Sequence, residues 1–431
     1  MKIINIVPGF GGVFYCGNCL RDGVFVNTLK AMGHESVMLP IYLPLTTQDS
    51  GCNTELPVFY GAVNIYLKQN YSLFRNMPGW MERFFDSKPI LKYAARKAGS
   101  TRATGLEEMT LSMLRGSEGF QNEELQQLID YLKHHEKPDV VHLSNALLLG
   151  FAEKIKKDLN IPVVCSLQDE DVWVDAMVPI YREQVWKLMR EKAEFVDAFI
   201  AVSDYFAGVM KKNISIPETK MHVVYIGVNP DMYQVFEPSV HPPYIGYLSR
   251  MCEENGFEII IDAFIELKKK PGFKNTRLRL TGGMTGDDKR FFNKQVRKLK
   301  KEGFRNDVEI MDDFRTEALP VFMKGLSVLS VPVMKGEAFG LYQIESLASG
   351  IPVVQPSLGA FPEISGASRG GVIYQPNTSS ALAAALADVI SKPEQLLQMS
   401  INGRNEVVNK FDSKKLAEQM IGIYEKILSK K

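Results

Sequence analysis

Short apolar runs alternate along the chain with longer segments whose apolar positions recur every three to four residues. Runs at residues 3–7 and 37–39 flank one such segment at 20–32, and the alternation continues through residues 138–225 and begins again at residue 244. The short runs predict buried strands, and the helical spacing between them predicts helices. Strands that alternate with helices form parallel sheets covered by helices. We therefore expect an α/β protein with two Rossmann-like, doubly wound parallel sheets.

A stiff polar stretch separates the two halves. It carries four prolines, Pro230, Pro238, Pro242 and Pro243. Such a composition is typical of a domain boundary. We expect an N-terminal domain at residues 1–238, a C-terminal domain at residues 239–411 and a last helix at residues 412–431.

Residues 60–119 do not follow the alternation. Aromatic side chains are dense there and are interleaved with Lys and Arg. One interpretation is a basic and aromatic surface for an acceptor glycan or a lipid headgroup. The interpretation that we favour is an inserted set of helices that covers the N-terminal sheet.

The most informative stretch, residues 330–364, reads as strand, loop, helix and strand. Its helix begins at Leu341 and ends at Gly350. Glu345 falls within the apolar stripe of this helix, where a carboxylate is costly unless a protein group or a ligand hydroxyl donates a hydrogen bond to it. Glu337 lies on the preceding loop, at the carboxyl end of a strand, where the ligands of open α/β sheets bind. Each acid alone is explained by solvation or by a buried ion pair, so it is their spacing that points to function.

The loop after the first strand is rich in glycine. Gly9, Gly11 and Gly12 do not form the G-x-G-x-x-G fingerprint, so we exclude a nicotinamide cofactor there. Cys16 and Cys19 form a C-x-x-C at the start of the next helix, a context that resembles a thioredoxin-like redox site. The sequence shows no second pair of zinc ligands, and we expect two small buried thiols that line the loop.

Composition narrows the class of protein. The chain has 431 residues, of which 45% are hydrophobic and 23% are charged, enough for two or three domains with substantial cores. A formal net charge of +1 gives no overall attraction to nucleic acid. The sequence has no apolar run long enough to predict a transmembrane helix, and its N-terminus lacks the apolar region of a signal peptide. Five irregularly spaced cysteines favour a reducing cytoplasm.

The two acids and their surroundings form a recognisable motif. Glu337-Ala-Phe-Gly-Leu-Tyr-Gln-Ile-Glu345 is followed by Ala348-Ser-Gly-Ile-Pro-Val-Val. This resembles the E-x7-E signature of retaining glycosyltransferases with the GT-B fold, in the glycogen synthase, sucrose synthase and mannosyltransferase group called family 4. The resemblance implies two Rossmann-like domains that face a central cleft, and a last helix, residues 412–431, that crosses back to the N-terminal domain. It also implies hexosyl transfer from a nucleotide-diphosphate sugar to a glycan or lipid-linked acceptor, with retention of configuration.

The resemblance assigns the donor to the C-terminal domain. Arg250 stands where the family places a phosphate-binding Arg, and a guanidinium fork suits a diphosphate leaving group. Glu345 would accept the ribose hydroxyls, and Glu337 would contact the transferred sugar. The phosphates would also meet the start of the helix, in the stretch Ala338, Phe339, Gly340 and Leu341.

Two positions depart from the family pattern. Asn255 replaces the Lys of the phosphate loop, and Gln168 replaces a His beside the reacting sugar. Gln168 can hydrogen-bond to a sugar hydroxyl but cannot titrate, so we expect it to position the sugar. By the same resemblance, Gly11 and Gly12 would let the donor phosphates and the acceptor approach the backbone.

We expect neither a metal nor a further cofactor, because Arg250 and the helix start supply the positive charge that a leaving diphosphate needs. The expected partners are a nucleotide sugar, with UDP, GDP and ADP all open, and a hydroxyl acceptor; peripheral contact with a membrane also stays open. Because of Asn255 and Gln168, the main alternative is a non-catalytic protein that binds nucleotide sugars or glycans on the same scaffold. A thiol oxidoreductase at Cys16 and Cys19 and a nucleotide-sugar epimerase of the same architecture are further alternatives.

Overall fold

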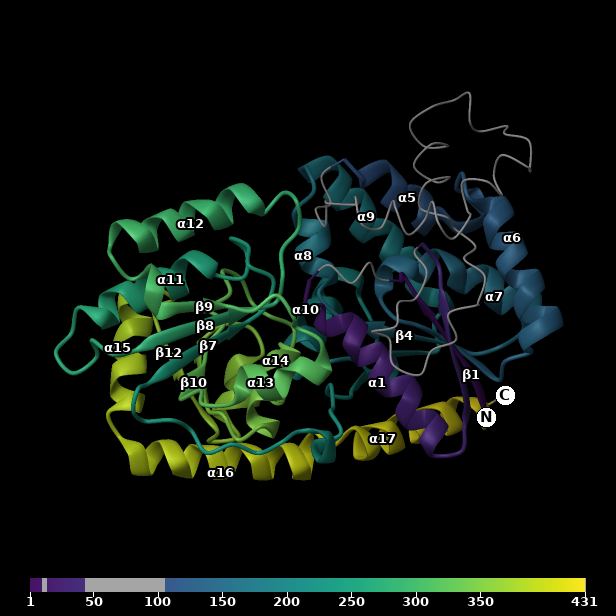
Figure 1. Cartoon of the computed structure of the whole chain (residues 1–431). Coiled ribbons are helices and arrows are strands. Elements are labelled where there is room, and N and C mark those ends of the chain that lie inside the picture. Colours follow the sequence, from purple (N-terminus) through teal and green to yellow (C-terminus); the bar gives the residue numbers. More distant parts are fainter. Residues whose placement is uncertain (10–13, 43–104, 431) are drawn as a thin grey trace. The chain divides into compact units, whose positions relative to one another are not determined.

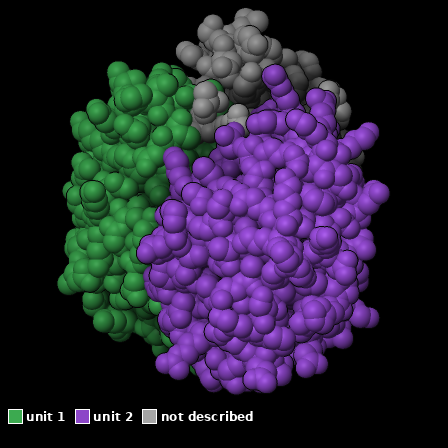
Figure 2. Space-filling model, turned by 90° about the vertical axis from the view of Figure 1, so that its left-hand side faces the viewer, with its two compact units in different colours: residues 1–12, 18–225, 417–431 green, residues 13–17, 226–416 purple. Residues whose placement is uncertain are grey.

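The computed structural model describes residues 1–9, 14–42 and 105–430. Gly11, Gly12 and residues 60–104 of the predicted insertion lie outside the described residues. The chain divides into two compact units, coloured separately in Figure 2. Unit 1 comprises Met1–Gly12, Asn18–Tyr225 and Ala417–Lys431, and unit 2 comprises Val13–Gly17 and Ile226–Leu416.

Unit 1 contains a six-stranded parallel sheet with the order β2-β1-β3-β4-β5-β6; β1 and β4 of this sheet are labelled in Figure 1. Its strands are β1 (Lys2–Val7), β2 (Glu35–Pro40), β3 (Val140–Leu143), β4 (Val163–Leu167), β5 (Ala198–Ala201) and β6 (Met221–Val223). Its helices are α1 (Gly17–Ala31), α5 (Glu107–Arg115), α6 (Asn122–Tyr131), α7 (Ala152–Leu159), α8 (Glu170–Asp175), α9 (Pro179–Lys192), α10 (Asp204–Ile214) and most of α17 (Ser413–Leu428). The residues of β3, β4 and β5 are all buried, as in strands that are covered on both faces.

Unit 2 contains a second six-stranded parallel sheet, with the order β12-β11-β10-β7-β8-β9 (Figure 1). Its strands are β7 (Tyr244–Leu248), β8 (Arg277–Thr281), β9 (Val308–Ile310), β10 (Val328–Leu329), β11 (Val353–Pro356) and β12 (Gly371–Tyr374). Its helices are α11 (Phe257–Lys268), α12 (Lys289–Lys301), α13 (Leu319–Met323), α14 (Leu341–Ala348), α15 (Ser379–Ile390) and α16 (Pro393–Lys410). The prediction of an α/β fold with two doubly wound parallel sheets is confirmed.

In each sheet the strand order reverses once. The reversal falls between β1 and β3 in unit 1 and between β7 and β10 in unit 2. Ligands of open α/β sheets bind at the carboxyl ends of the strands that flank such a reversal. In unit 2 the loop after β7 carries Arg250 and the loop after β10 carries Glu337. Topology therefore brings the loops of two predicted site residues to the same edge of one sheet.

The chain passes from unit 1 to unit 2 at Ile226 rather than at residue 239. The reason is that the intervening stretch hydrogen-bonds to the backbone of unit 2. Val228 N donates to Phe411 O at 3.0 Å, and Phe236 N donates to Ser349 O at 2.9 Å. A proline-rich composition predicts a stiff connection, but only these contacts decide with which unit it packs.

The helical spacing of apolar residues within 146–159 predicts a single helix. In the structure this segment begins as a 3-10 helix at Ala146–Phe151 and continues as α7. The Asn145 side chain accepts a hydrogen bond from Leu147 N at 3.0 Å and so caps the first turn. Helix α6 is absent from the sequence-based expectation, although its apolar residues Leu125, Leu128 and Ile129 recur at the helical spacing and are buried.

Candidate functional site

Glu345 lies on α14, a helix whose eight residues are all buried. Glu345 is only 2% exposed to solvent. Tyr15 Oη donates to Glu345 Oε2 at 2.6 Å, and Tyr233 Oη donates to Oε1 at 3.1 Å. Burial raises the pKa of Glu345 to about 7, against the opposing effect of the two tyrosine hydrogen bonds. The carboxylate is thus satisfied by hydroxyl groups, the same kind of donor that a ribose offers.

Glu337 lies on the loop that leads into α14 and is half-buried. Its Oε2 accepts a hydrogen bond from Tyr342 Oη at 3.1 Å, and its backbone oxygen accepts one from Ala360 N at 2.9 Å. The loop is packed tightly, because a Cβ added to Gly359 would lie 2.3 Å from Glu337 O. The position of the Glu337 carboxyl is therefore determined by the loop and by Tyr342.

The loop between the two acids turns into α14 at Gly340, whose φ of 77° is readily adopted only by glycine. The side chains of Ala338, Phe339 and Leu341 are buried in the core of unit 2, and the Phe339 ring packs against Phe411 at 6.1 Å. These residues can therefore offer a ligand only their backbone groups, as an amide-based phosphate contact requires.

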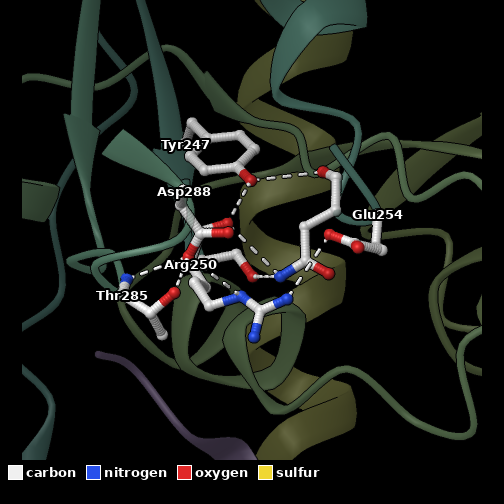
Figure 3. A network of polar contacts seen from close by, with 7 residues as sticks. Tyr247, Arg250, Glu254, Thr285 and Asp288 are labelled. Atoms are coloured by element: carbon white, nitrogen blue, oxygen red, sulfur yellow. Dashed lines mark hydrogen bonds and ion pairs between the residues drawn. The ribbon is translucent and has the colours of Figure 1, made fainter. Parts of the chain in front are cut away.

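Arg250 follows β7 and is largely buried, with its side chain 14% exposed. Figure 3 shows its guanidinium between two carboxylates. Arg250 Nη2 lies 3.4 Å from Glu254 Oε2, and Nε lies 3.7 Å from Asp288 Oδ2. Asp288 is held in turn by Thr285, whose amide and hydroxyl donate to it at 2.8 and 2.7 Å. The pKa of Arg250 is raised: burial opposes the charged form, but nearby groups, among them Cys252, Asp288 and Glu254, favour it more strongly.

Asn255, at the position where the family carries Lys, holds the Arg250 loop together. Its Nδ2 donates to Ser249 Oγ at 2.8 Å, and its backbone oxygen accepts a hydrogen bond from the Tyr247 hydroxyl at 3.2 Å. The same hydroxyl donates to Arg250 O at 2.9 Å. In this conformation the Asn255 amide shapes the loop that presents Arg250.

Gly256, which ends this loop, should not tolerate a side chain. Its φ is 70°, and an added Cβ would lie 1.7 Å from Pro332 O. Gly256→Ala should lower the free energy of unfolding by about 3 kcal/mol or more, since left-handed strain and overpacking add. Gly272→Ala is the matched control, because Gly272 also has a positive φ, 87°, but no atom within 4 Å of an added Cβ. Urea denaturation checks this, and equal losses in the two variants would contradict the close approach to Pro332.

Gln168 lies at the end of β4 in unit 1, and both ends of its amide are engaged. Its Oε1 accepts from Arg21 Nη1 at 2.6 Å, and its Nε2 donates to Ser144 O at 2.7 Å. The backbone amide of Gln168 donates to Glu170 Oε2 at 2.7 Å. Burial raises the pKa of Glu170 to about 8, while amide hydrogen bonds oppose this. Gln168 is therefore fixed in orientation at the carboxyl edge of the first sheet.

Behind Gln168 lies a buried polar chain that the sequence does not predict. Arg21 Nη2 contacts Ser166 Oγ, which lies 2.7 Å from His142 Nε2. His142 Nδ1 lies 2.5 Å from the hydroxyl of Tyr424 on α17. Burial, with a smaller effect of Arg21, lowers the pKa of His142 to about 3, so the imidazole is neutral near pH 7.

Unit 1 also has a pocket at its strand-order reversal. Its walls come from the ends of β1 and β3, from the first turns of α1 and from Gln168. Asn18, Cys19, Asp22 and Ser144 are among its lining residues. The side chains of Cys16 and Cys19 are half-buried, where the sequence predicts buried thiols. This pocket lies at the edge where the fold class places ligands.

The structure therefore groups the predicted site residues in two sets. Arg250, Glu337 and Glu345 lie in unit 2, and Gln168 lies in unit 1; Gly11 and Gly12 lie outside the described residues. The partners that sequence reasoning missed are tyrosines, namely Tyr15, Tyr233 and Tyr342. No local pattern marks Tyr15 and Tyr233, because they are 330 and 112 positions from Glu345. Tyr342 lies within the motif itself, five positions after Glu337, and its spacing could have indicated the contact.

The described residues contain neither a cluster of metal-binding side chains nor a helix that could cross a membrane. No group of three or more His, Cys, Asp or Glu is arranged there to hold a metal ion. Among the helices of the same residues, none combines the length and apolar character that crossing a bilayer demands.

Comparison with known families assigns both halves of the chain. The model of the glycosyl transferases group 1 matches residues 231–406, and the model of Glycosyltransferase Family 4 matches residues 111–232. The chain therefore has two regions that match the models of glycosyltransferase domains. The two matches meet at residues 231–232, close to Ile226, where the chain enters unit 2.

Individual relatives of these glycosyltransferase domains are distant in sequence. The chain is 24% identical over 307 residues to the MMP alpha-(1->4)-mannosyltransferase of Mycolicibacterium hassiacum, a match that covers 68% of this chain and 71% of the relative. It is 23% identical over 298 residues to a glycogen synthase of Mycobacterium tuberculosis, covering 67% of this chain and 69% of the relative.

Solved structures establish the fold as GT-B. The Anabaena protein HepE in complex with UDP superposes with a TM-score of 0.70 at 15% identity, covering 99% of this chain and 100% of HepE. Sucrose-phosphate synthase from Thermosynechococcus elongatus superposes with a TM-score of 0.71 at 16% identity, and the match covers 100% of both chains. The GT-B fold expected from the Glu337 to Glu345 motif is therefore confirmed.

Proposed function

We propose that this chain is a retaining, metal-independent hexosyltransferase that moves a sugar from a nucleotide-diphosphate sugar to a hydroxyl of a glycan or lipid-linked acceptor. One observation carries the proposal. Glu345 is a buried carboxylate whose two oxygens each accept a hydroxyl hydrogen bond, on the helix that follows the strand-order reversal of a glycosyltransferase group 1 domain. Such a carboxylate suits the ribose diol of a nucleotide.

The remaining donor groups have complementary roles. The Arg250 guanidinium and the backbone amides at the start of α14 would stabilise the charge that develops on the leaving diphosphate, an effect worth several kcal/mol in a preorganised site. Glu337, whose carboxyl Tyr342 holds at 3.1 Å, would contact the transferred sugar. Gln168, held by Arg21 and Ser144, would orient a sugar hydroxyl without exchanging a proton.

The donor base is the first unknown to resolve. Solved structures of HepE contain UDP, UDP with glucose, and UDP-glucose, which makes a uridine nucleotide the first candidate, ahead of GDP and ADP. The acceptor would enter over Gly11 and Gly12, as the resemblance to family 4 implies.

The experiment that tests the proposal supplies water as the acceptor. The full chain is incubated with UDP-, GDP- and ADP-linked hexoses in the presence of a chelator, and release of the nucleoside diphosphate is followed. We expect slow hydrolysis with one base only, and a product whose anomeric configuration, read by NMR, equals that of the donor. Absence of both binding and hydrolysis across the panel, with and without the chelator, would contradict the proposal. Hydrolysis that occurs without the chelator and stops when the chelator is added would contradict metal independence.

A second candidate is binding of a nucleotide sugar without transfer. It is favoured by Asn255 and Gln168, because both side chains form hydrogen bonds within the protein where the family carries Lys and His. The same experiment separates the two functions. Tight binding of one nucleotide sugar with neither hydrolysis nor transfer, to any of a panel of glycan acceptors, is the outcome expected of a binding protein.

A further inference from the structure

Two consecutive aromatic residues contact the groups that the proposed function assigns to the donor. The Phe14 ring centre lies 5.6 Å from the guanidinium carbon of Arg250, within the range of a cation–π contact. Tyr15 Oη donates to Glu345 Oε2 at 2.6 Å. The Tyr15 ring also lies 6.5 Å from that of Tyr342, whose hydroxyl donates to Glu337, the first acid of the motif.

The backbone of this segment is fixed to unit 2. Tyr15 N donates to Gly282 O at 2.8 Å, and Phe14 forms an antiparallel bridge with Gly283. Farther along, a Cβ added to Gly17 would lie 3.3 Å from Leu341 Cβ, so the chain passes directly against the first residue of α14. Residues 14–17 therefore extend from the loop after β8 to the start of α14, although unit 2 otherwise begins at Ile226.

The contact of Tyr15 with Glu345 excludes a ligand at that oxygen. Tyr15 and Glu345 are 7% and 2% exposed, so little solvent reaches either residue. A carboxylate oxygen can accept two hydrogen bonds, but the burial of both residues leaves a ribose hydroxyl little access to Glu345 Oε2 except at the position of Tyr15 Oη. The two hydroxyls are chemically equivalent donors to a carboxylate, and they compete for one site.

We propose that residues Phe14 and Tyr15 occupy the donor position of unit 2 in the free protein and withdraw when a nucleotide binds, with the Tyr15 hydroxyl exchanging for a ribose hydroxyl on Glu345. This inference rests on the proposed function, because it takes Arg250 and Glu345 as the donor contacts. Withdrawal removes the Phe14 ring from Arg250 and the Tyr15 side chain from Glu345 together, since the two residues are adjacent. Donor binding thereby becomes coupled to the segment that leads into α1.

The test compares nucleotide affinity in the wild type and in Tyr15→Phe. The variant keeps the ring but cannot donate to Glu345, so the free state loses a hydrogen bond that the nucleotide complex never contained. Isothermal titration of the full chain with UDP, GDP and ADP should show that Tyr15→Phe binds the preferred nucleotide at least about tenfold more tightly, the gain expected from removing a competing charge-assisted hydrogen bond.

Tyr244→Phe is the matched control. The Tyr244 hydroxyl also donates to a half-buried carboxyl, Glu309 Oε1, at 3.1 Å. Tyr244 is the first residue of β7 and so lies at the opposite end of this strand from Arg250. Its affinity should equal that of the wild type. If the wild type binds a nucleotide and Tyr15→Phe binds it equally well or more weakly, the proposed exchange of Tyr15 for a ribose hydroxyl is overturned, while the proposed function stays intact. Failure of both proteins to bind any nucleotide overturns the proposed function and the exchange with it.

A second measurement uses the wild type alone and does not depend on how the variant folds. Hydrogen exchange of a peptide that covers residues 14–17 is recorded with and without the preferred nucleotide. Because the Tyr15 amide is bonded to Gly282 O in the free protein, withdrawal should make it exchange faster in the complex. Slower exchange in the complex would show that the segment stays in place and closes over the ligand, and this would overturn the proposal.

Discussion

Glu345→Gln should weaken binding of the nucleotide sugar by at least about 100-fold, because two charge-assisted hydrogen bonds to ribose hydroxyls, each worth about 1.5–3 kcal/mol, lose their anionic acceptor. The amide has nearly the same shape as the carboxyl and still offers one oxygen to Tyr15 or Tyr233, so the fold should persist. Titration calorimetry with the preferred nucleotide sugar gives the affinity, and thermal unfolding confirms that the variant is folded.

The pH dependence of this binding has a definite sign. Burial raises the pKa of Glu345 to about 7, so the carboxylate is ionised above that value and protonated below it. Donor affinity should therefore fall as pH decreases through 7, and Glu345→Gln should not show this fall. For the free energy of unfolding the pH dependence has the opposite sign. The stability linked to the raised pKa of Glu345 is fully present below pH 4.5, the pKa of an unfolded Glu, and is lost as pH rises through about 7.

Glu309→Gln is the control for the substitution at Glu345. Glu309 also accepts a tyrosine hydrogen bond, from Tyr244 at 3.1 Å, and it pairs with Arg279 on the neighbouring strand at 2.8 Å. It belongs to β9, at the edge of the sheet. Its replacement should leave donor affinity unchanged. An unchanged affinity in Glu345→Gln as well would rule out Glu345 as the ribose contact.

Arg250→Ala should lower kcat/KM by about 1,000-fold, the loss of roughly 4 kcal/mol of transition-state stabilisation. Most of the loss should appear in kcat, because the charge on the leaving diphosphate develops in the transition state. Arg250→Lys keeps the charge but loses the planar fork, so we expect an intermediate loss of about 10- to 100-fold. Steady-state kinetics of donor hydrolysis or of transfer measure these effects.

Arg277→Ala is the control for the substitutions at Arg250. Arg277 also pairs with an acid, Glu309 at 3.8 Å, and its guanidinium lies over the Tyr244 ring at 5.7 Å. It is the first residue of β8 and so stands at the amino edge of the sheet, away from the ligand-binding edge. The kcat/KM of Arg277→Ala should stay near that of the wild type. A rise in KM with an unchanged kcat in Arg250→Ala would instead assign Arg250 to binding of the ground state.

Much of the fold could be predicted from the sequence because strand and helix periods are local properties. The short apolar runs at residues 244–248 and 277–281 predict strands, and these coincide with β7 and β8. The predicted stop of the Glu345 helix agrees with Gly350, whose φ is 77°. The weaker predictions were those that depend on distant contacts. The start of the segment 146–159 is an example, since an added Cβ on Gly150 would lie 1.9 Å from Met113 O and the chain there packs on α5.

The candidate site shows the same division. A carboxylate on the apolar stripe of a helix, eight positions after a loop acid, is visible in the sequence, and it indicates that Glu345 needs a hydrogen-bond donor. Whether that donor is a basic side chain or a hydroxyl is not visible. The structure places two tyrosines there, at 2.6 and 3.1 Å, one of them from the chain's first loop.

The sequence by itself therefore determined the alternating elements, the two parallel sheets and the acids and arginine that carry the glycosyltransferase motif. Only the tertiary structure decided that the stretch after Ile226 belongs with unit 2, that Asn255 shapes the Arg250 loop, and that Phe14 and Tyr15 lie on Arg250 and Glu345. The physical reason is that periodicity and turn chemistry act over a few residues. The partner of a buried polar group is set by which distant segments the folded chain brings within about 3 Å of it.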